Sequence, residues 1–131
     1  MSKMGDSPRP SRIQLHQRSR ELELEYANGE QHTLSCEYLR VYSPSAEVLG
    51  HGPGQEVLQT GKLHVAISDV KPVGNYALQL VFDDGHDTGI YSWNYLYALC
   101  TEYESRWQRY LDRLKDAGAD RDPQVQVLKL D

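Results

Sequence analysis

The stretch Asn75-Tyr-Ala-Leu-Gln-Leu-Val-Phe82 decides the fold, because its apolar residues alternate with the two-residue period of a β-strand. Asp83-Asp84-Gly85-His86 follows as a predicted turn, since aspartate bonds its own backbone and glycine accepts positive φ. Thr88-Gly-Ile-Tyr91 is then long enough for a short return strand. We expect the core to lie against the first strand's apolar face, which consists of Tyr76, Leu78, Leu80 and Phe82.

A helix is predicted directly after this return strand. Ser92 is a suitable N-cap, because its hydroxyl can accept a hydrogen bond from an unpaired N–H of the first turn. Thr101-Glu-Tyr-Glu104 has the capping-box pattern, so we expect the helix of residues 93–114 to break near Cys100. Apolar residues at three- and four-residue steps form one stripe of this helix. The stripe consists of Trp93, Leu96, Tyr97, Cys100, Tyr103, Trp107, Leu111 and Leu114.

The remaining apolar patterns predict more strands, and hence an α+β fold with one small antiparallel sheet and the C-terminal helix packed near it. Asn28-Gly29 favours a two-residue hairpin, because both central positions of that turn need positive φ. Leu63, Val65 and Ile67 share one face of a strand that we expect Pro72 and Gly74 to close. The predicted strands cover residues 12–16, 21–26, 31–34, 63–70, 75–83 and 88–91.

The segments outside the sheet are predicted from turn and capping residues. Ser35–Val41 should form one or two helical turns, which Pro44 ends. Residues 43–60 are rich in glycine and proline and are expected to be a long loop. Residues 1–11 have the composition of a disordered tail. The domain therefore covers residues 12–116, and residues 117–131 form an extension in which Val125–Leu130 could add an edge strand.

Composition and charge restrict the function classes. The chain has 131 residues and a net charge of -5, which repels phosphate and argues against a nucleic-acid partner. No apolar run approaches the roughly 18 residues of a membrane span, and the N-terminus lacks a signal-peptide core, so we expect a cytoplasmic protein with no membrane partner. Cys36 and Cys100 lie too far apart for a Cys-x-x-Cys motif and are expected to be reduced packing residues. The sequence leaves the oligomeric state open.

The predicted turn contains the densest group of candidate site residues. Asp83, Asp84, His86 and Asp87 place three carboxylates and an imidazole within five positions, and these could bind a hard cation or form an acid/base pair. The same residues are also common in turns that have no other role. Gly50-His-Gly-Pro-Gly54 lacks the pattern of a phosphate-binding loop, because Pro53 removes a donor. We expect His51, Asp84, His86, Asp87 and Tyr91 to form one polar patch suited to a protein partner or a small anionic group.

Four segments of the chain resemble a small bacterial domain family of unknown function. They are Tyr38-Leu-Arg-Val-Tyr-Ser-Pro-Ser-Ala-Glu-Val48, Gly50-His-Gly-Pro-Gly-Gln55, Pro72-Val-Gly-Asn-Tyr-Ala77 and Asp84-Gly-His-Asp-Thr-Gly-Ile-Tyr-Ser-Trp93. The family is similar to the N-terminal domain of gamma-butyrobetaine hydroxylase, whose iron and 2-oxoglutarate chemistry belongs to a separate domain. A similar domain is appended to plastid scaffold proteins of iron–sulfur cluster assembly. The resemblance implies an accessory module.

The resemblance also implies a zinc site, which this sequence does not preserve. In the hydroxylase the ligands are three cysteines and one histidine. The alignment places Ser43, Ser45 and Val48, which we call the thiolate positions, where the cysteines would be, and His86 where the histidine would be. Serine and valine supply no thiolate, so we expect no bound metal and no other cofactor.

Two functional interpretations follow from the sequence. The first is a non-catalytic accessory or protein-interaction module, connected by the resemblance to iron–sulfur cluster assembly or to oxygenase systems. The alternative is a small metal-dependent enzyme that uses the turn of Asp84, His86 and Asp87, although no nucleophile motif stands out. The sequence does not identify the partner.

Overall fold

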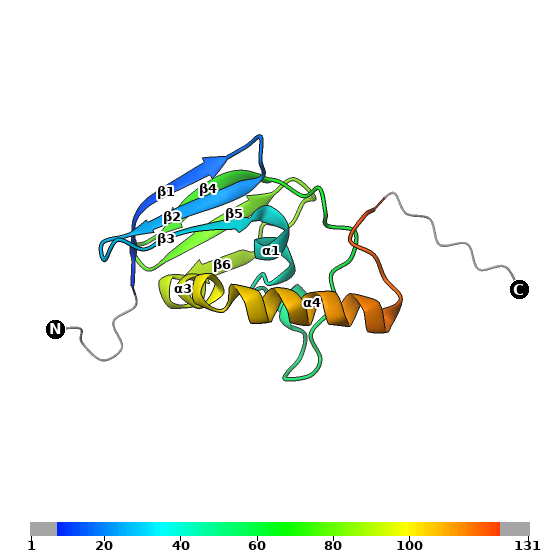
Figure 1. The fold of residues 1–131 in the computed structure, drawn as a ribbon. Coiled ribbons are helices and arrows are strands. Elements are labelled where there is room, and N and C mark those ends of the chain that lie inside the picture. The colour runs from blue at the N-terminus through cyan, green and yellow to red at the C-terminus, as the bar shows by residue number, and fades with distance from the viewer. Residues whose placement is uncertain (1–7, 124–131) are drawn as a thin grey trace, which may run out of the picture.

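The chain forms two three-stranded antiparallel sheets, with the helices below them in Figure 1. The computed structural model describes residues 8–123. The first sheet has the order β1 (Pro10–His16), β2 (Glu21–Tyr26), β3 (Gln31–Ser35), and the second has the order β4 (Ile67–Val73), β5 (Ala77–Phe82), β6 (Gly89–Ser92). The α+β class is therefore confirmed, but the expected single sheet is wrong, because β3 and β4 do not pair.

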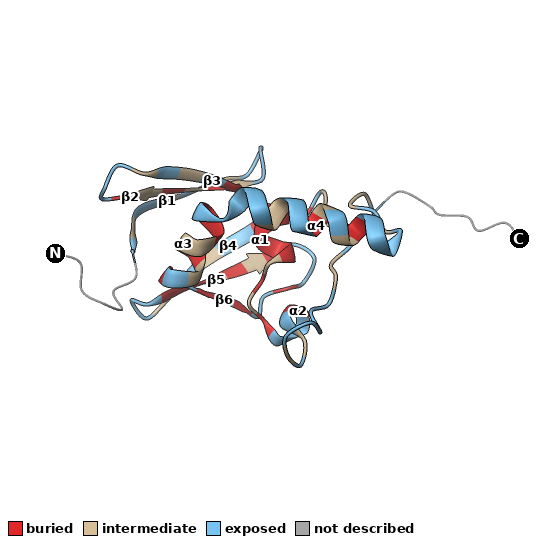
Figure 2. Ribbon diagram, turned by 60° about the horizontal axis from the view of Figure 1, so that its bottom comes forward, coloured by how far each residue is buried: buried red, intermediate tan, exposed pale blue. Residues whose placement is uncertain are grey.

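The core lies between the two sheets and the helices, where Figure 2 shows the buried residues in red. Alternate residues of β2 and β3 meet those of β5, as the period of two predicts. Side chains from α3 complete this core. Its fully buried members include Leu22, Leu24, Ile67, Leu80, Leu96 and Leu99.

The strand predicted for residues 75–83 is shorter than expected and forms β5, Ala77–Phe82. Leu78, Leu80 and Phe82 are buried as expected, but Tyr76 is 60% exposed and precedes β5. Tyr76 lies in a turn in which its N–H donates to the Val73 carbonyl. Gly74 has a φ of 53° there, and a Cβ at this position would lie 2.7 Å from the Tyr76 ring. The tight turn therefore removes Tyr76 from the alternation.

Several strand ends also differ from the predictions. β1 begins at Pro10, within the predicted tail, and residues 1–7 lie outside the described residues. β4 runs through Pro72 instead of ending before it. Proline is tolerated because β4 is an edge strand that pairs only with β5. The predicted strand Val125–Leu130 lies outside the described residues.

The first hairpin forms where predicted, with a different loop. The Tyr26 N–H donates to the Glu30 carbonyl at 2.9 Å, which leaves three loop residues instead of two. Only Gly29 of the Asn28-Gly29 pair has positive φ, at 91°. The expectation that both residues would adopt positive φ is therefore wrong.

The helices confirm most of the capping predictions. Ser35 caps α1 (Cys36–Val41) and Ser92 caps α3 (Trp93–Thr101) through their hydroxyls. The predicted break is confirmed, because Glu102 alone separates α3 from α4 (Tyr103–Ala117). The predicted capping box is wrong, since Thr101 is the helical last residue of α3 and its hydroxyl donates to the Ala98 carbonyl. A short helix, α2 (Ala46–Leu49), lies inside the predicted loop.

The segment after α4 returns to the domain. Gly118 ends α4 in the left-handed conformation, with a φ of 63°. The N–H groups of Gly61 and Leu63 then donate to the carbonyls of Asp120 and Arg121, each at 2.9 Å. The Arg121 guanidinium makes two hydrogen bonds, of 2.7 and 2.8 Å, to the buried Glu37 carboxylate on α1. Among residues 8–123, no helix is both long and apolar enough to cross a membrane.

Candidate functional site

His86 is the buried centre of a polar cluster between the β5–β6 turn and the α1–α2 connection, in which the Glu47 side chain reaches the surface. Its Nε2 lies 2.8 Å from the Ser43 hydroxyl and 3.4 Å from the Ser45 hydroxyl. Its Nδ1 lies 3.1 Å from a Glu47 carboxylate oxygen. His86 and Ser45 are each 6% exposed, and Ser43 is completely buried. We call Ser43, Ser45, Glu47 and His86 the histidine cluster.

The geometry of the histidine cluster shows which nitrogen of the neutral His86 imidazole carries the proton. A carboxylate only accepts hydrogen bonds, so Nδ1 of His86 donates to Glu47, and Nε2 accepts from the Ser43 hydroxyl. Burial and then the nearby Arg40 charge lower the pKa of His86, and the partial offset from Glu47 does not reverse this direction. The imidazole is therefore held neutral near pH 7.

Gly89 allows the cluster to pack closely against β6. A Cβ at Gly89 would lie 2.4 Å from the Ser43 hydroxyl oxygen and 3.0 Å from a Tyr91 ring carbon. Both distances are shorter than an ordinary van der Waals contact, so glycine is required by the approach of these side chains. The Tyr91 hydroxyl in turn donates to the Leu39 carbonyl, and burial strongly raises the pKa of this phenol.

Asp84 anchors the same turn through two cations. Its carboxylate accepts from Arg40 Nε at 2.9 Å and from Lys62 Nζ at 2.6 Å. Partial burial alone would raise the pKa of Asp84, but the bonds from Lys62, the His86 backbone N–H and Arg40 outweigh it and lower the pKa to about 2. Asp84 is thus ionised and already paired.

The structure brings together only part of the predicted site. Asp84 and His86 belong to the same turn, with His86 and Tyr91 below the surface. His51 and Asp87 are exposed, and no hydrogen bond joins either side chain to the other predicted residues. The expectation of one polar patch is therefore corrected: His86 and Tyr91 serve the interior, and only His51, Asp84 and Asp87 face solvent.

Sequence reasoning missed the partners of these residues. Glu47 lies on α2, a helix that the glycine- and proline-rich composition of the segment concealed. Arg40 and Lys62 are 44 and 22 positions away from Asp84. A buried ionisable turn residue does require a partner, but no pattern in the chain indicates which one.

The histidine cluster has the hydrogen-bond order of a Ser–His–Glu triad, but its serine is not accessible. A nucleophile has to reach a reacting atom. Ser43 has no exposed surface, and none of the five pockets described is lined by Ser43, Ser45 or His86. The cluster therefore joins the α1–α2 connection to the β5–β6 turn and offers no reaction site at the surface.

The donor set does not fit the zinc that the resemblance implies. The structure places two thiolate positions, Ser43 and Ser45, beside His86, as the alignment requires. Their hydroxyls are bonded to the imidazole, and Val48, the third position, is a buried apolar side chain. Residues 8–123 contain no group of three or more His, Cys, Asp or Glu side chains placed to hold a metal ion. The residues at these positions therefore do not fit a zinc ion.

Comparison with known proteins places this geometry in a family. Two solution NMR structures match this chain. The first has a TM-score of 0.81 and 50% sequence identity, and the match covers 95% of this chain and 98% of that protein. The second has a TM-score of 0.78 and 51% identity, and the match covers 100% of this chain and 98% of that protein. A crystal structure of a protein of unknown function from Acidithiobacillus ferrooxidans, of the DUF971 family, matches with a TM-score of 0.59 and 42% identity, over 71% of this chain and 93% of its own.

The curated proteins contain no match to this chain. Residues 13–97 match the family described as "Gamma-butyrobetaine hydroxylase-like, N-terminal". This match covers more than half of the chain and includes β2 to β6 and the histidine cluster. The chain belongs to the gamma-butyrobetaine hydroxylase-like N-terminal domain family.

Proposed function

We propose that this protein is a non-catalytic accessory module that binds another protein in a bacterial cytoplasm. One observation carries the proposal: His86 and Asp84, the turn residues best suited to acid/base or metal chemistry, are already bonded to other side chains of the protein. His86 is held by Ser43 and Glu47, and Asp84 is held by two cations. An ionisable group that is already bonded to other side chains stabilises the structure, so recognition of a partner depends on other, exposed residues.

The family suggests the setting of this interaction. The resemblance supports a role beside iron–sulfur cluster assembly or 2-oxoglutarate oxygenase systems, where similar domains accompany a catalytic or scaffold domain. By analogy with these proteins, the partner belongs to one of the two systems.

The loop after α2 supplies the surface for this proposal. Leu49 and Val57 are 46% and 51% exposed, and both flank the glycine-rich segment that contains His51. Leu49, His51 and Pro53 line an open pocket of about 480 Å³. Loops held by a rigid scaffold frequently carry binding residues, and exposed apolar side chains gain from being covered by a partner.

The metal-dependent alternative lacks a supporting observation. Asp84 already accepts from two cations, and both nitrogens of His86 are engaged. Asp87 is exposed on the turn, and its backbone carbonyl accepts from Gln79. A metal would have to displace these contacts and recruit ligands from elsewhere.

The test is affinity purification of the tagged protein from its native cells, followed by quantitative mass spectrometry. The double variant His51→Ala with Leu49→Ser changes exposed residues and should lose the partner at an unchanged melting temperature. His16→Ala, at the end of β1 in the first sheet, is the matched control and should retain the partner. His86→Ala should lower the melting temperature instead, because it removes the centre of the histidine cluster. If the tagged protein captures only the proteins that an unrelated tagged control also captures, with or without crosslinking, it has no such partner and the proposal fails.

A further inference from the structure

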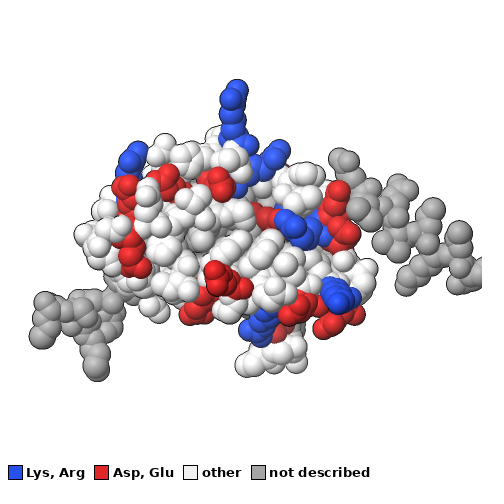
Figure 3. Space-filling view, in the orientation of Figure 1, with Lys and Arg blue, Asp and Glu red and all other residues white. Residues whose placement is uncertain are grey.

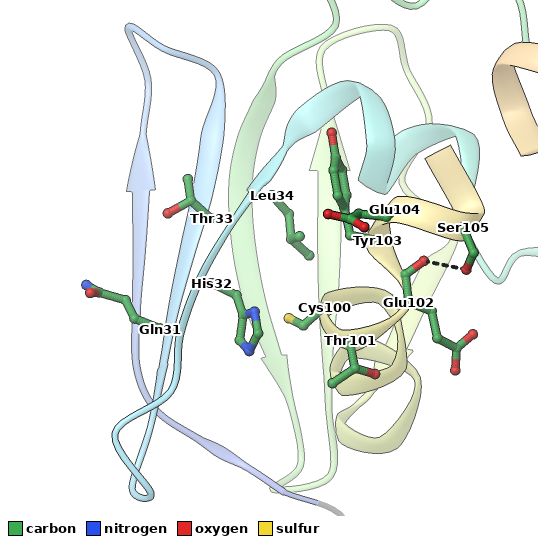
Figure 4. Close-up of a pocket in the computed structure, with 10 residues that line it drawn as sticks. All are labelled: Gln31, His32, Thr33, Leu34, Cys100, Thr101, Glu102, Tyr103, Glu104 and Ser105. Atoms are coloured by element: carbon green, nitrogen blue, oxygen red, sulfur yellow. Dashed lines mark hydrogen bonds between the residues drawn. The ribbon is translucent and has the colours of Figure 1, made fainter. Parts of the chain in front are cut away.

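A groove of about 560 Å³ lies between β3 and the corner where α3 meets α4 (Figure 4), and it is the largest of the pockets described. Neighbouring side chains of a strand point to opposite faces. A cavity that touches four consecutive strand residues therefore runs along the edge of the strand. The groove is lined by Gln31 to Leu34 of β3 and by Cys100 to Ser105 of the helix corner.

The hydrogen-bond register shows which backbone groups face the groove. The Tyr26 N–H donates to Glu30, and the Cys36 N–H donates to Arg20, so these pairs are of the hydrogen-bonded type at the two ends of the β2–β3 ladder. Hydrogen-bonded and non-bonded pairs alternate in an antiparallel ladder. His32 and Leu34 therefore bond to β2, opposite Leu24 and Leu22. The N–H and C=O groups of Gln31 and Thr33 consequently point away from β2.

These outward groups have no backbone partner within residues 8–123. The edge of β3 also lacks the usual protection against strand addition, which consists of charges, proline, bulges or a very short strand. β3 has no charged residue, no proline and no irregularity in its pairing with β2. The other three edges are protected: β1 has Pro10 and a bulge, β4 has Pro72 and a bulge, and β6 has four residues.

The charges of the groove favour a basic occupant. No lysine or arginine lines it. Glu102 is paired with Arg106 at 3.0 Å, whereas Glu104 has no ion-pair partner within the described residues. On the face shown in Figure 3, acidic side chains predominate over the left half, where the strands and the helix corner lie.

The groove also contains an unsatisfied buried atom. Nε2 of His32 makes no hydrogen bond, although it lies 3.5 Å from a Glu30 carboxylate oxygen. In Figure 4 the imidazole points from β3 toward Cys100. Burial raises the pKa of Cys100 to about 11, so the thiol stays protonated and forms an apolar part of the wall with Leu34 and Tyr103.

We propose that an extended basic segment of a partner protein binds in this groove as an additional strand paired with β3. Gln31 and Thr33 would donate and accept its backbone hydrogen bonds, Glu104 would pair with a lysine or arginine, and the exposed ring of Tyr103 would contact its apolar side chains. Strand addition is an established mode of peptide recognition, with backbone bonds for affinity and side chains for specificity. This inference rests on the proposed protein-binding function and adds the place and chemistry of one partner segment.

The test uses the full chain and a defined peptide. β3 has five residues, about 17 Å of strand at about 3.4 Å per residue, so a capped heptapeptide of alternating lysine and valine spans it. In a titration followed by 15N NMR, the amide signals of Gln31 and Thr33 and those of residues 101–105 should shift. The same peptide with alternate amides N-methylated on its pairing edge should bind at least about tenfold more weakly, since it lacks donors. A glutamate–valine peptide should also bind at least about tenfold more weakly, because Glu104 repels it.

Two matched pairs of variants locate the interaction. Thr33→Pro removes an outward N–H that β2 does not use and should abolish binding, whereas Thr33→Val keeps that N–H and should retain it. Glu104→Gln should weaken the affinity for the lysine peptide about threefold or more. Asp116→Asn, which changes an exposed carboxylate at the other end of α4, should leave this affinity unchanged. If Thr33→Pro does not fold, the N-methylated peptide still decides the question.

Three results would overturn the inference: shifts that map away from the groove, equal binding of the N-methylated peptide, or no binding of the lysine peptide. These outcomes are separate from the test of the proposed function. A partner that co-purifies with the chain while the groove stays inert removes only the groove. A groove that binds the peptide in a protein without native partners removes the accessory role and the partner segment, and leaves only the ability of β3 to pair with an added strand.

Discussion

Gly89→Ala should destabilise the protein through one close contact with the histidine cluster. The new methyl group would lie 2.4 Å from the Ser43 hydroxyl oxygen and 3.0 Å from the Tyr91 ring. Both neighbours are fully buried, so neither can move into solvent. Overpacking of a well-packed interior typically costs about 1 to 3 kcal/mol, and we expect this range for Gly89→Ala.

A second substitution should reveal the cause. Ser43→Ala alone removes the short hydrogen bond to His86 and should cost about 1 to 3 kcal/mol, since a buried acceptor loses its partner. In the double variant the 2.4 Å clash disappears, because the Ser43 Cβ is 3.6 Å from the new methyl group. The double variant should therefore be more stable than the sum of the single effects predicts, by about 1 kcal/mol.

Urea denaturation followed by tryptophan fluorescence measures these free energies, since the chain has two tryptophans, one of them buried in the core. Gly52→Ala is the matched control, because a Cβ there meets nothing within 4 Å and its φ is not positive. Its midpoint should remain within error or rise slightly. If Gly89→Ala leaves the midpoint unchanged, or if the two single effects add within about 0.5 kcal/mol, the close-packing argument is wrong.

Three further predictions concern pH, metal and the long helix. Because the fold lowers the pKa of His86, the contribution of this residue to stability is complete above about pH 6.5 and should decline as the pH falls below that value. Asp84, with a pKa of about 2, should lose its contribution to stability between about pH 4 and 2. Urea midpoints measured across this pH range test both expectations. Cysteine at all three thiolate positions should create a zinc site with His86, and metal analysis should then find one zinc per chain. The unsubstituted protein, and the triple variant that also carries His86→Ala, should bind no stoichiometric zinc. The nitrogen–sulfur separation around zinc is about 3.6 Å, to which the observed 2.8 and 3.4 Å need only a small adjustment. Trp107→Ala should cost up to about 3 kcal/mol, the low end for a buried tryptophan, because this side chain is half-buried. An unchanged melting temperature would show that the contacts of Trp107 do not stabilise the fold.

The sequence predicted the elements that local chemistry determines. The alternation from Leu78 to Phe82 and the caps at Ser35 and Ser92 were correct, because each depends on residues within one or two turns of chain. The break between α3 and α4 was also predicted at the right place, although the capping box from which it was predicted does not form. The division into two sheets was not, since alternation identifies the buried face of a strand and not the strand beside it.

The site was less predictable, because its contacts join distant positions. Asp84 and His86 were identified from their types, but their burial depends on α2 and on Arg40, which lies 44 positions from Asp84. The alignment with the family did place Ser43 and Ser45 opposite His86, and the structure confirms that proximity. The role of the exposed residues His51 and Asp87 stays a prediction.

The ion pair between Glu37 and Arg121 has a consequence for synthesis in the cell. The two residues are 84 positions apart, and Arg121 also secures the segment after α4 to the strand connection near Leu63. Domains begin to fold as they leave the ribosome, N-terminal parts first. α1 emerges early, but its carboxylate has no partner until Arg121 has been translated and released. The final closure of the domain should therefore wait until Arg121 has left the ribosome, and a stalled nascent chain that ends before Arg121 should be more accessible to chaperones and proteases than a chain that includes it.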